Sequence, residues 1–240
     1  MRGDVYKRHI ENFKNHWWFK GRKKIIEIIL EKNKNKKKLD ILDFGAGSGT
    51  NLKMLSKFGK VYIYEPHQST KAFLKKNYKS KNFQVLKKIT NKKFDIILLA
   101  DVLEHLKNDK REMDKLSKNL KNKGKFLITV PAFQLLFTRK DVILGHYRRY
   151  NRGKLKSVFK NYKVIKLTYF NFFLFFPIAI VLLIFRILKI DFIDDVEKRP
   201  NNFFNSLLYS IFVFESKIIN FINFPFGISI IQSISFRSIF

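Results

Sequence analysis

The chain has 240 residues, 46% of them hydrophobic and 28% charged, a composition that indicates one globular domain and excludes a disordered tail protein. It contains no cysteine, which excludes disulfide frameworks, thiolate zinc sites, iron–sulfur centres and a cysteine nucleophile. The 49 lysine and arginine residues outnumber the 19 aspartate and glutamate residues, which gives a net charge of +30.

This positive charge has two interpretations. An excess of cations is typical of proteins that bind nucleic acid or an anionic membrane surface. Codon bias in an AT-rich genome produces the same excess, and here phenylalanine is abundant (27 residues) while glycine (10) and proline (5) are scarce. We favour codon bias over nucleic-acid binding, because the lysines are scattered and their densest runs, 32–38 and 87–93, fall where loops are expected.

Residues 1–38 are predicted to form a helical N-terminal extension. Apolar residues between Trp17 and Leu30 recur at spacings that place them on one face of a helix, and the lysine run at 32–38 ends that helix. We expect no secretory signal peptide, because the start is polar and the apolar stretch 25–30 is short.

Strands and helices alternate over residues 39–170, which predicts an α/β core with a doubly wound, mostly parallel sheet. The predicted strands are 39–44, 61–64, 83–86, 94–100, 125–130 and 164–169. The predicted helices are 50–58, 69–78, 109–120 and 154–159. Gly59 and Gly124 are expected to end the first and third of these helices, and Asn151 is expected to cap the start of the fourth.

Residues 171–240 are more apolar than the core. We predict a cap of one or two apolar helices and a seventh strand at 228–236, all within a single domain. One helix should present a stripe made of Phe204, Leu207, Leu208, Ile211, Glu215 and Ile218. The alternative is a helix over 172–190 that lies in a membrane interface, flanked by Lys166, Arg186 and Lys189. A membrane span is less expected, because polar residues and proline interrupt the uncharged stretches.

A glycine-rich turn follows the first predicted strand. Gly45, Gly47 and Gly49 occupy alternate positions, so the backbone can turn tightly and approach a ligand at the start of the next helix. The carboxylate of Asp43, two residues before the turn, would repel a pyrophosphate and attract an ammonium group. Glu65 ends the second strand, where an acid accepts hydrogen bonds from ribose hydroxyls. Together these residues predict a cationic, ribose-bearing nucleoside, S-adenosylmethionine.

With these motifs the chain resembles the class I S-adenosylmethionine-dependent methyltransferases. The matching stretches are LDFGAGSG at 42–49, YEP at 64–66, DII at 95–97, ADVLEHL at 100–106 and GKFLITVP at 124–131. The resemblance implies a Rossmann-like methyltransferase fold and methyl transfer from S-adenosylmethionine. HWWF at 16–19 and GHYRRY at 145–150 are similar to a bacterial subgroup of the small-molecule type, whose members often occur in glycan or lipid-linked biosynthesis.

The resemblance also implies roles for single residues. The cofactor site that it implies consists of Asp43, Gly45, Ala46, Gly47, Gly49, Glu65, Pro66, Asp101 and Val102. The turn would hold the methionine end, Glu65 the ribose, and the stretch at Asp101 would lie beside both the methionine moiety and the substrate. The chain departs from the family at 87–90, where KKIT offers no acid to contact the adenine.

Catalytic and substrate-binding residues are expected in two further places. Methyl transfer is an in-line displacement that gains from alignment of the partners, and an acceptor that must lose a proton also needs a base. His146, in a long connection after the fifth strand, or His105, after the fourth, is the candidate base. Arg148 and Arg149 would bind an acidic or phosphorylated acceptor, or would be two more exposed cations of a basic protein.

The N-terminal aromatic segment has two interpretations. Trp18 and its neighbours would anchor the N-terminal helix in the core, or they would form a lid over the cofactor that brings Trp18 and Arg22 to the substrate. The dispersed histidines suggest no metal site.

The acceptor is expected to be a small or lipid- or glycan-linked molecule, methylated at oxygen or nitrogen. The protein is expected in the cytoplasm, either free or peripheral at the inner face of the membrane. An RNA methyltransferase is one alternative, although the position after the fourth strand (ADVL, 100–103) lacks the motif of base amino methylation. The other alternative is a non-catalytic, membrane-associated module that keeps the fold.

Overall fold

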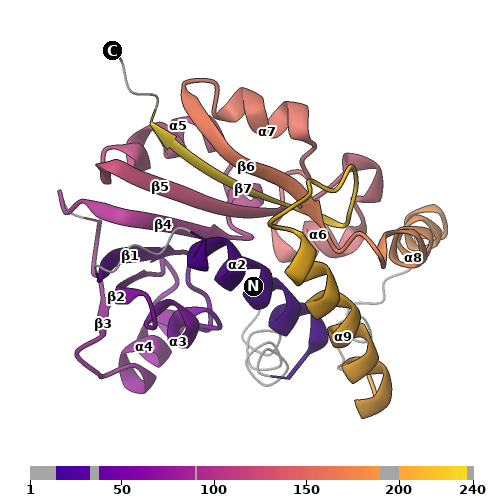
Figure 1. The fold of residues 1–240 in the computed structure, drawn as a ribbon, viewed down its shortest axis with the longest axis horizontal. Coiled ribbons are helices and arrows are strands. Elements are labelled where there is room, and N and C mark those ends of the chain that lie inside the picture. The colour runs from indigo at the N-terminus through magenta and orange to yellow at the C-terminus, as the bar shows by residue number, and fades with distance from the viewer. Residues whose placement is uncertain (1–14, 33–37, 90, 190–199, 237–240) are drawn as a thin grey trace.

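The computed structural model describes residues 15–32, 38–89, 91–189 and 200–236 (Figure 1). The strands are β1 (Leu39–Phe44), β2 (Gly59–Tyr64), β3 (Phe83–Val85), β4 (Phe94–Ala100), β5 (Leu120–Pro131), β6 (Tyr162–Phe170) and β7 (Ser229–Phe236). The helices are α2 (Trp17–Glu31), α3 (Leu52–Leu55), α4 (Gln68–Asn77), α5 (Asp109–Ser117), α6 (Arg139–Leu144), α7 (Arg152–Val158), α8 (Phe175–Ile187) and α9 (Asn202–Ile218), with short 3-10 helices η1 (Leu103–His105) and η2 (Gln134–Leu136).

The seven strands form one sheet in the order β3-β2-β1-β4-β5-β7-β6. All neighbours are parallel except β7, which lies antiparallel between β5 and β6. The predicted doubly wound, mostly parallel sheet is therefore confirmed. The strand order reverses between β1 and β4, and ligands of such sheets bind at the carboxyl ends of the strands that flank this point.

The burial of the central strands accounts for their apolar sequences. Ile41 and Leu42 of β1 and Ile97, Leu98 and Leu99 of β4 have no exposed surface. In Figure 1, α3 and α4 lie below β1 and α2 runs beside it, whereas α5 and α7 lie above, beyond β5. A strand covered on both faces needs apolar residues at consecutive positions, which is the pattern that predicted these strands.

Gly59 and Gly124, which were expected to end helices, lie in strands instead. Gly59 is the first residue of β2, and the helix before it has only four residues, α3. Gly124 lies inside β5, where a Cβ atom would come within 2.8 Å of the Phe94 carbonyl oxygen. The pairing of β4 with β5 shifts register next to Phe94. Gly124 is thus required by a close approach of two backbones, and α5 ends earlier, at Ser117. Asn151 does cap α7, as its side chain accepts from the backbone N–H of Lys154.

Of the stripe predicted on α9, only Glu215 is buried. Phe204 and Leu207 are exposed, whereas Asn205, Phe212, Glu215 and Ser216 are buried. The polar members of this face satisfy backbone groups: Asn205 accepts from the N–H of Trp17, and Glu215 accepts from the N–H groups of the turn that follows β6. Hydrogen bonds to the backbone therefore decide which side of α9 faces the core.

Packing between α2 and α9 gives a paired prediction. A Cβ atom on Gly21 of α2 would lie 2.4 Å from the ring of the buried Phe212, so Gly21→Ala should destabilise the fold by about 1–3 kcal/mol. Gly153 of α7 is the matched control, since its nearest neighbour is an ordinary 3.5 Å contact and alanine favours helices by about 0.5–1 kcal/mol. Urea unfolding should show midpoint shifts of opposite sign. Two shifts of the same sign would contradict this account of the interface.

The described part of residues 171–240 contains α8, α9 and the predicted last strand, β7. Both helices lie at the right of Figure 1, with α8 at the edge of the molecule. Ile190, the end of the predicted interfacial helix, lies outside the described residues. No helix among the described residues combines the length and the apolar character that crossing a bilayer needs.

Candidate active site

The glycine-rich turn leaves β1 at the carboxyl edge of the sheet. Gly45, Gly47 and Gly49 all have positive φ angles, of 75°, 53° and 82°. The N–H of Gly45 donates to the carbonyl oxygen of Tyr64 at 2.8 Å, which ties the turn to the end of β2. Around Gly47 a Cβ atom would meet nothing within 4 Å. The turn therefore exposes its backbone to open space at Gly47, as a ligand that approaches the main chain requires.

Asp43 lies directly below this turn with 1% of its surface exposed. Its Oδ2 atom has no hydrogen-bond partner among the described residues. Burial raises the pKa of Asp43 to about 7, an effect that the Arg22 cation opposes and the nearby Glu65 carboxylate increases. A buried carboxylate without a partner is costly, and a cationic ligand group such as an ammonium would satisfy it. The site thus fits the methionine end of S-adenosylmethionine.

Glu65 is fixed at the end of β2. One carboxylate oxygen accepts from the N–H of Gly47 at 2.9 Å and the other from the N–H of His67 at 3.0 Å. Glu65 is buried, and Pro66 after it is exposed. These two hydrogen bonds hold an acidic group against the glycine-rich turn, near enough to Asp43, 22 residues earlier in the sequence, for the two charges to interact.

Asp101 and Val102 follow β4 and complete the same edge. Asp101 has a positive φ of 55°, unusual for a residue other than glycine. Its backbone N–H and its carboxylate both bond to Thr129 of β5, and the carboxylate also pairs with Arg22. Val102 packs over the turn, since a Cβ atom on Gly45 would come within 2.8 Å of its side chain. Strain of this kind is often found at functional sites, where the surroundings enforce it.

The N-terminal helix α2 contacts both the core and this edge. Trp18 packs against Phe170 and Phe212, with ring centroids 6.3 Å and 5.8 Å apart, as an anchor in the core would. Arg22, one turn later, is buried and reaches Asp101. The two interpretations of the segment thus apply to different residues: Trp18 anchors the helix, and Arg22 extends to the site.

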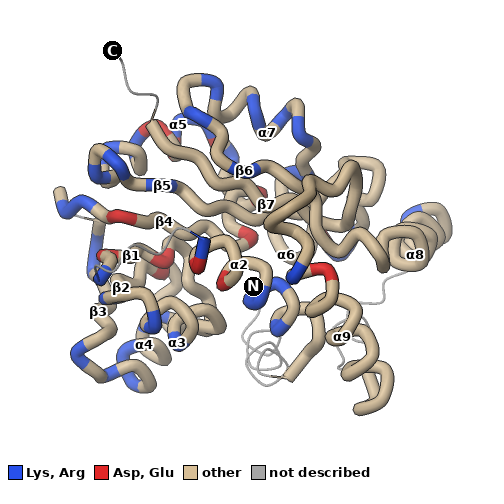
Figure 2. Tube along the Cα trace, viewed as in Figure 1, with Lys and Arg blue, Asp and Glu red and all other residues tan. Residues whose placement is uncertain are grey.

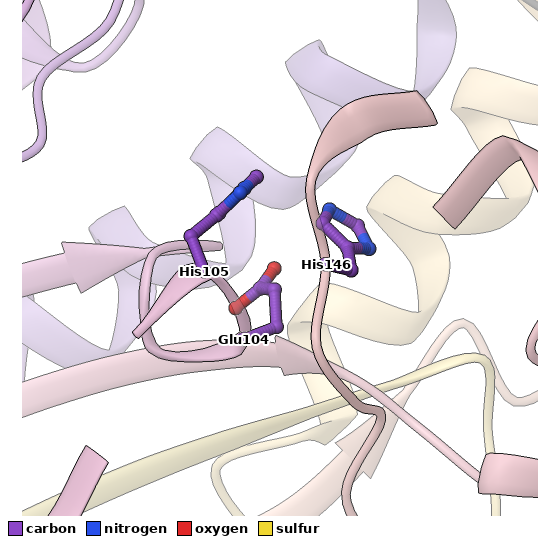
Figure 3. Close-up of side chains that lie close together, drawn as sticks. All are labelled: Glu104, His105 and His146. Carbon is purple, nitrogen blue, oxygen red and sulfur yellow. The ribbon is translucent and has the colours of Figure 1, made fainter. Parts of the chain in front are cut away.

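Two histidines and a glutamate meet after β4 (Figure 3). The rings of His105 and His146 lie 4.5 Å apart, and ligand atoms of Glu104, His105 and His146 all lie within 4.8 Å of one another. Burial, with Asp101 nearby, raises the pKa of Glu104 well above its usual range. Burial and His146 lower the pKa of His105 to about 4. Three groups that can ligate a metal meet here, the neighbours Glu104 and His105 and the distant His146, so the expected absence of a metal stays a prediction.

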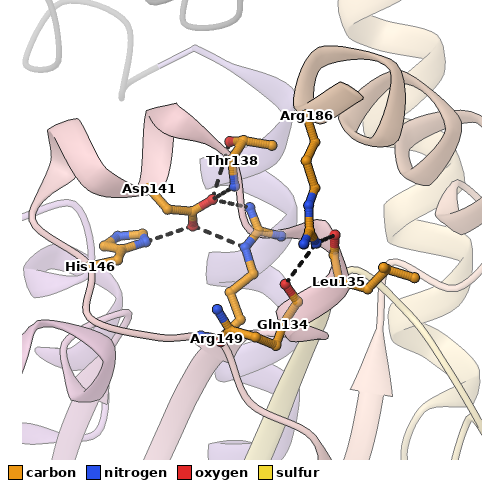
Figure 4. A network of polar contacts seen from close by, with 7 residues as sticks. All are labelled: Gln134, Leu135, Thr138, Asp141, His146, Arg149 and Arg186. Atoms are coloured by element: carbon orange, nitrogen blue, oxygen red, sulfur yellow. Dashed lines mark hydrogen bonds and ion pairs between the residues drawn. The ribbon is translucent and has the colours of Figure 1, made fainter. Parts of the chain in front are cut away.

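His146 belongs to a buried polar network shown in Figure 4. Its Nδ1 lies 2.9 Å from Oδ1 of Asp141, which Arg149 also binds through Nε and a terminal nitrogen, each at 2.9 Å. Burial acts to raise the pKa of Asp141, but the hydrogen bonds from His146 and Arg149 outweigh it and hold that pKa well below its usual range. Asp141 is therefore ionised at neutral pH and fixes the orientation of the imidazole.

Comparison with known proteins identifies the family. A family model described as a methyltransferase domain matches residues 16–163, more than half of the chain. The chain belongs to this methyltransferase family. An uncharacterized protein of Methanocaldococcus jannaschii is 30% identical over 110 residues, which cover 44% of this chain and 46% of that protein. The methyltransferase thus matches less than half the length of this relative.

Solved structures share the fold of the methyltransferase. Coclaurine N-methyltransferase bound to N-methylheliamine and S-adenosylhomocysteine has a TM-score of 0.56 at 12% identity, over 88% of this chain and 70% of that one. A TehB-like S-adenosylmethionine-dependent methyltransferase from Corynebacterium glutamicum has a TM-score of 0.53 at 14% identity, over 88% of each chain. At these identities the likeness shows a common Rossmann-like methyltransferase fold.

One residue of the candidate site was not predicted from the sequence, and two others have an environment that differs from the expected one. Asp141 was missed, although the spacing Thr138-x-x-Asp141 marks a helix start, and the two residues form the capping box of α6. Arg149 is buried against Asp141, and Arg148 pairs with Asp109 at 3.0 Å and donates to a backbone carbonyl. Both arginines are therefore engaged within the protein in this structure.

Proposed function

We propose that this enzyme transfers a methyl group from S-adenosylmethionine to an oxygen or nitrogen of a small, lipid-linked or glycan-linked acceptor, as a member of the bacterial small-molecule subgroup. The observation that carries the proposal is the unpartnered, buried carboxylate of Asp43 beneath the open backbone of Gly47. An apolar surface on α8, described below, favours a lipid-linked acceptor and a peripheral position at the inner face of the membrane.

Different residues of the chain would bind different parts of the cofactor. Asp43 would pair with the ammonium group, and the backbone at Gly45, Ala46, Gly47 and Gly49 would contact the methionine end. Glu65, held in place by two N–H groups, would accept the ribose hydroxyls, with Pro66 beside it. Asp101 and Val102 would line the side that faces the acceptor. When bound, S-adenosylmethionine supplies an electrophilic methyl group on a sulfonium, and the chain supplies alignment and a base.

His146 is the better of the two candidate bases. Asp141 accepts a hydrogen bond from Nδ1 of His146, which leaves Nε2 as the basic nitrogen. His105, by contrast, has a pKa of about 4, so it is neutral and weakly basic near pH 7. Arg149 would hold Asp141 in place and thus act as a positioning residue. Arg22 would shape the wall of the acceptor site from α2, and Trp18 would support that wall by holding α2 in the core.

The base gives a direct test. Purified protein would be incubated with tritium-labelled S-adenosylmethionine and a chloroform–methanol extract of bacterial membranes, and label would be counted in the lipid phase. His146→Gln should lower the rate of transfer by about 100- to 10,000-fold, the range of a lost general base, while S-adenosylhomocysteine binding stays intact. Tyr147→Phe, at an exposed neighbouring position, should transfer at the wild-type rate.

The same assay separates the alternatives. Label in tRNA instead of the lipid or small-molecule fraction would replace the proposal by an RNA methyltransferase, whose binding should weaken steeply with salt. Normal turnover by His146→Gln would remove His146 as the base. EDTA should leave the rate unchanged, and a loss of activity restored by a divalent cation would indicate a metal, for which Glu104, His105 and His146 are the candidate ligands.

A further inference from the structure

Helix α8 exposes a continuous apolar face. Of its 13 residues only Ala179 is fully buried. One side packs through Ala179 on Leu136 of η2 and on Ile228, the residue before β7. The outer side consists of apolar residues at helical spacing, with the following fractions of their surface exposed: Phe176 62%, Ile180 56%, Val181 45%, Ile184 44%, Ile187 76% and Leu188 62%. An apolar face of this extent marks an interaction surface.

A cationic cavity adjoins the C-terminal end of this helix. It has a volume of about 400 Å³ and lies between η2, α6 and α8. Arg139, Arg186 and Lys189 line it together with Thr138, and no acidic residue is among its described lining residues. Arg186 is held in place because its guanidinium donates to the carbonyl oxygens of Gln134 and Leu135 (Figure 4). The cavity therefore places three cationic side chains where an anionic group could bind.

We infer that α8 lies in the membrane interface and that this cavity binds the phosphate headgroup of a lipid whose chains extend along the apolar face of α8. A helix with apolar residues on its outer side and cations at one end is suited to the boundary between acyl chains and anionic headgroups. Figure 2 shows α8 without acidic residues and with a basic segment at its end. A protein partner would leave this pairing of an apolar face with a cationic cavity unexplained.

The cavity is connected to the proposed catalytic base. Gln134, in its lining, accepts from the backbone N–H of Arg149, which binds Asp141, the partner of His146. Thr138, also in the lining, donates its backbone N–H to Asp141 at 2.8 Å. A lipid headgroup in the cavity would thus lie next to the network that orients His146. The inference rests on the proposed function only in taking this lipid as the acceptor or its neighbour, since the binding itself requires no cofactor.

Vesicle flotation tests this inference without turnover. Wild-type protein should float with vesicles of phosphatidylcholine and phosphatidic acid, and less with phosphatidylcholine alone. Ile184→Asp or Ile187→Asp should lower the partition coefficient by about 10-fold or more, because a carboxylate would enter the apolar boundary. Arg139→Gln with Lys189→Gln should lower it by about 5-fold per cation for the phosphatidic acid vesicles alone.

Matched variants elsewhere control for general effects. Ile165→Asp on β6 changes a residue that is 42% exposed, close to the 44% of Ile184, and Lys75→Gln with Lys76→Gln removes two cations from the exposed side of α4. Neither should change flotation. Equal loss of flotation in the control and test variants would overturn the inference. It would also be overturned if the wild-type protein bound no vesicles while both wild type and Ile184→Asp bound glycerol 3-phosphate in solution. Calorimetry with S-adenosylhomocysteine on the same samples reports separately on the proposed function.

Discussion

Asp43→Asn should weaken the binding of S-adenosylhomocysteine by about 100-fold in calorimetry. The substitution keeps the shape of the side chain and removes the negative charge that would face the ligand's ammonium group. A hydrogen bond to a charged group contributes about 1.5–3 kcal/mol, and here the acid lies buried where water cannot replace it. This is the largest effect on binding that we expect from any single substitution at the site.

Asp40→Asn on the same strand is the matched control. Asp40 lies near the other end of β1, partly exposed, and pairs with Lys121 at 3.1 Å. An exposed ion pair of this kind contributes about 1 kcal/mol or less to stability, and none to a ligand at the opposite edge of the sheet. Equal affinities of wild type and Asp43→Asn would mean that the cofactor binds elsewhere.

The pH dependence of binding follows from the same carboxyl group. Burial raises the pKa of Asp43 to about 7, and the ligand's ammonium group requires the ionised form. The affinity for S-adenosylhomocysteine should therefore rise by about 10-fold between about pH 6 and about pH 8, and Asp43→Asn should lose this dependence. The pH dependence of folding stability has the opposite sign. A carboxyl group with a raised pKa lowers the stability of the folded state as pH rises from about 4 through about 7. At pH 8 the unliganded Asn variant should thus melt no lower than wild type.

Arg149→Leu should destabilise the fold by about 3–5 kcal/mol, because it leaves the buried Asp141 carboxylate without its two-point partner. For a chain of this size that corresponds to a fall in melting temperature of about 6–20 °C. Arg148→Leu, at the adjacent and less buried ion pair, should cost about 1 kcal/mol.

A double substitution keeps this second prediction testable where the single variant unfolds. Asp141→Leu with Arg149→Leu removes both charges, so it should recover part of the stability that Arg149→Leu loses, while the orientation of His146 and hence turnover stay impaired. If the double variant lost more stability than the sum of the losses in the two single variants, the pair would not be the reason for the burial of Asp141.

The sequence by itself determined the sheet and the glycine-rich turn. The runs 39–44 and 94–100 were predicted with their observed bounds, because a strand covered on both faces carries its signal in consecutive apolar residues. The glycine-rich turn was also predicted from the sequence, since positive φ angles and a close backbone approach require glycine at fixed positions. These constraints act between neighbours in the chain, so a short stretch of sequence is enough to predict them.

Only the tertiary structure decided which distant groups meet. Arg22 reaches Asp101 across 79 residues, and His105 lies against His146. The face of α9 that is buried depends on the backbone N–H groups that Glu215 satisfies, and the role of Gly124 depends on the strand beside it. The apolar residues of 175–187 were visible in the sequence, but whether they face the core or solvent depended on how little of α8 the sheet covers. Such choices are set by packing and by the pairing of buried polar groups, which no local pattern records.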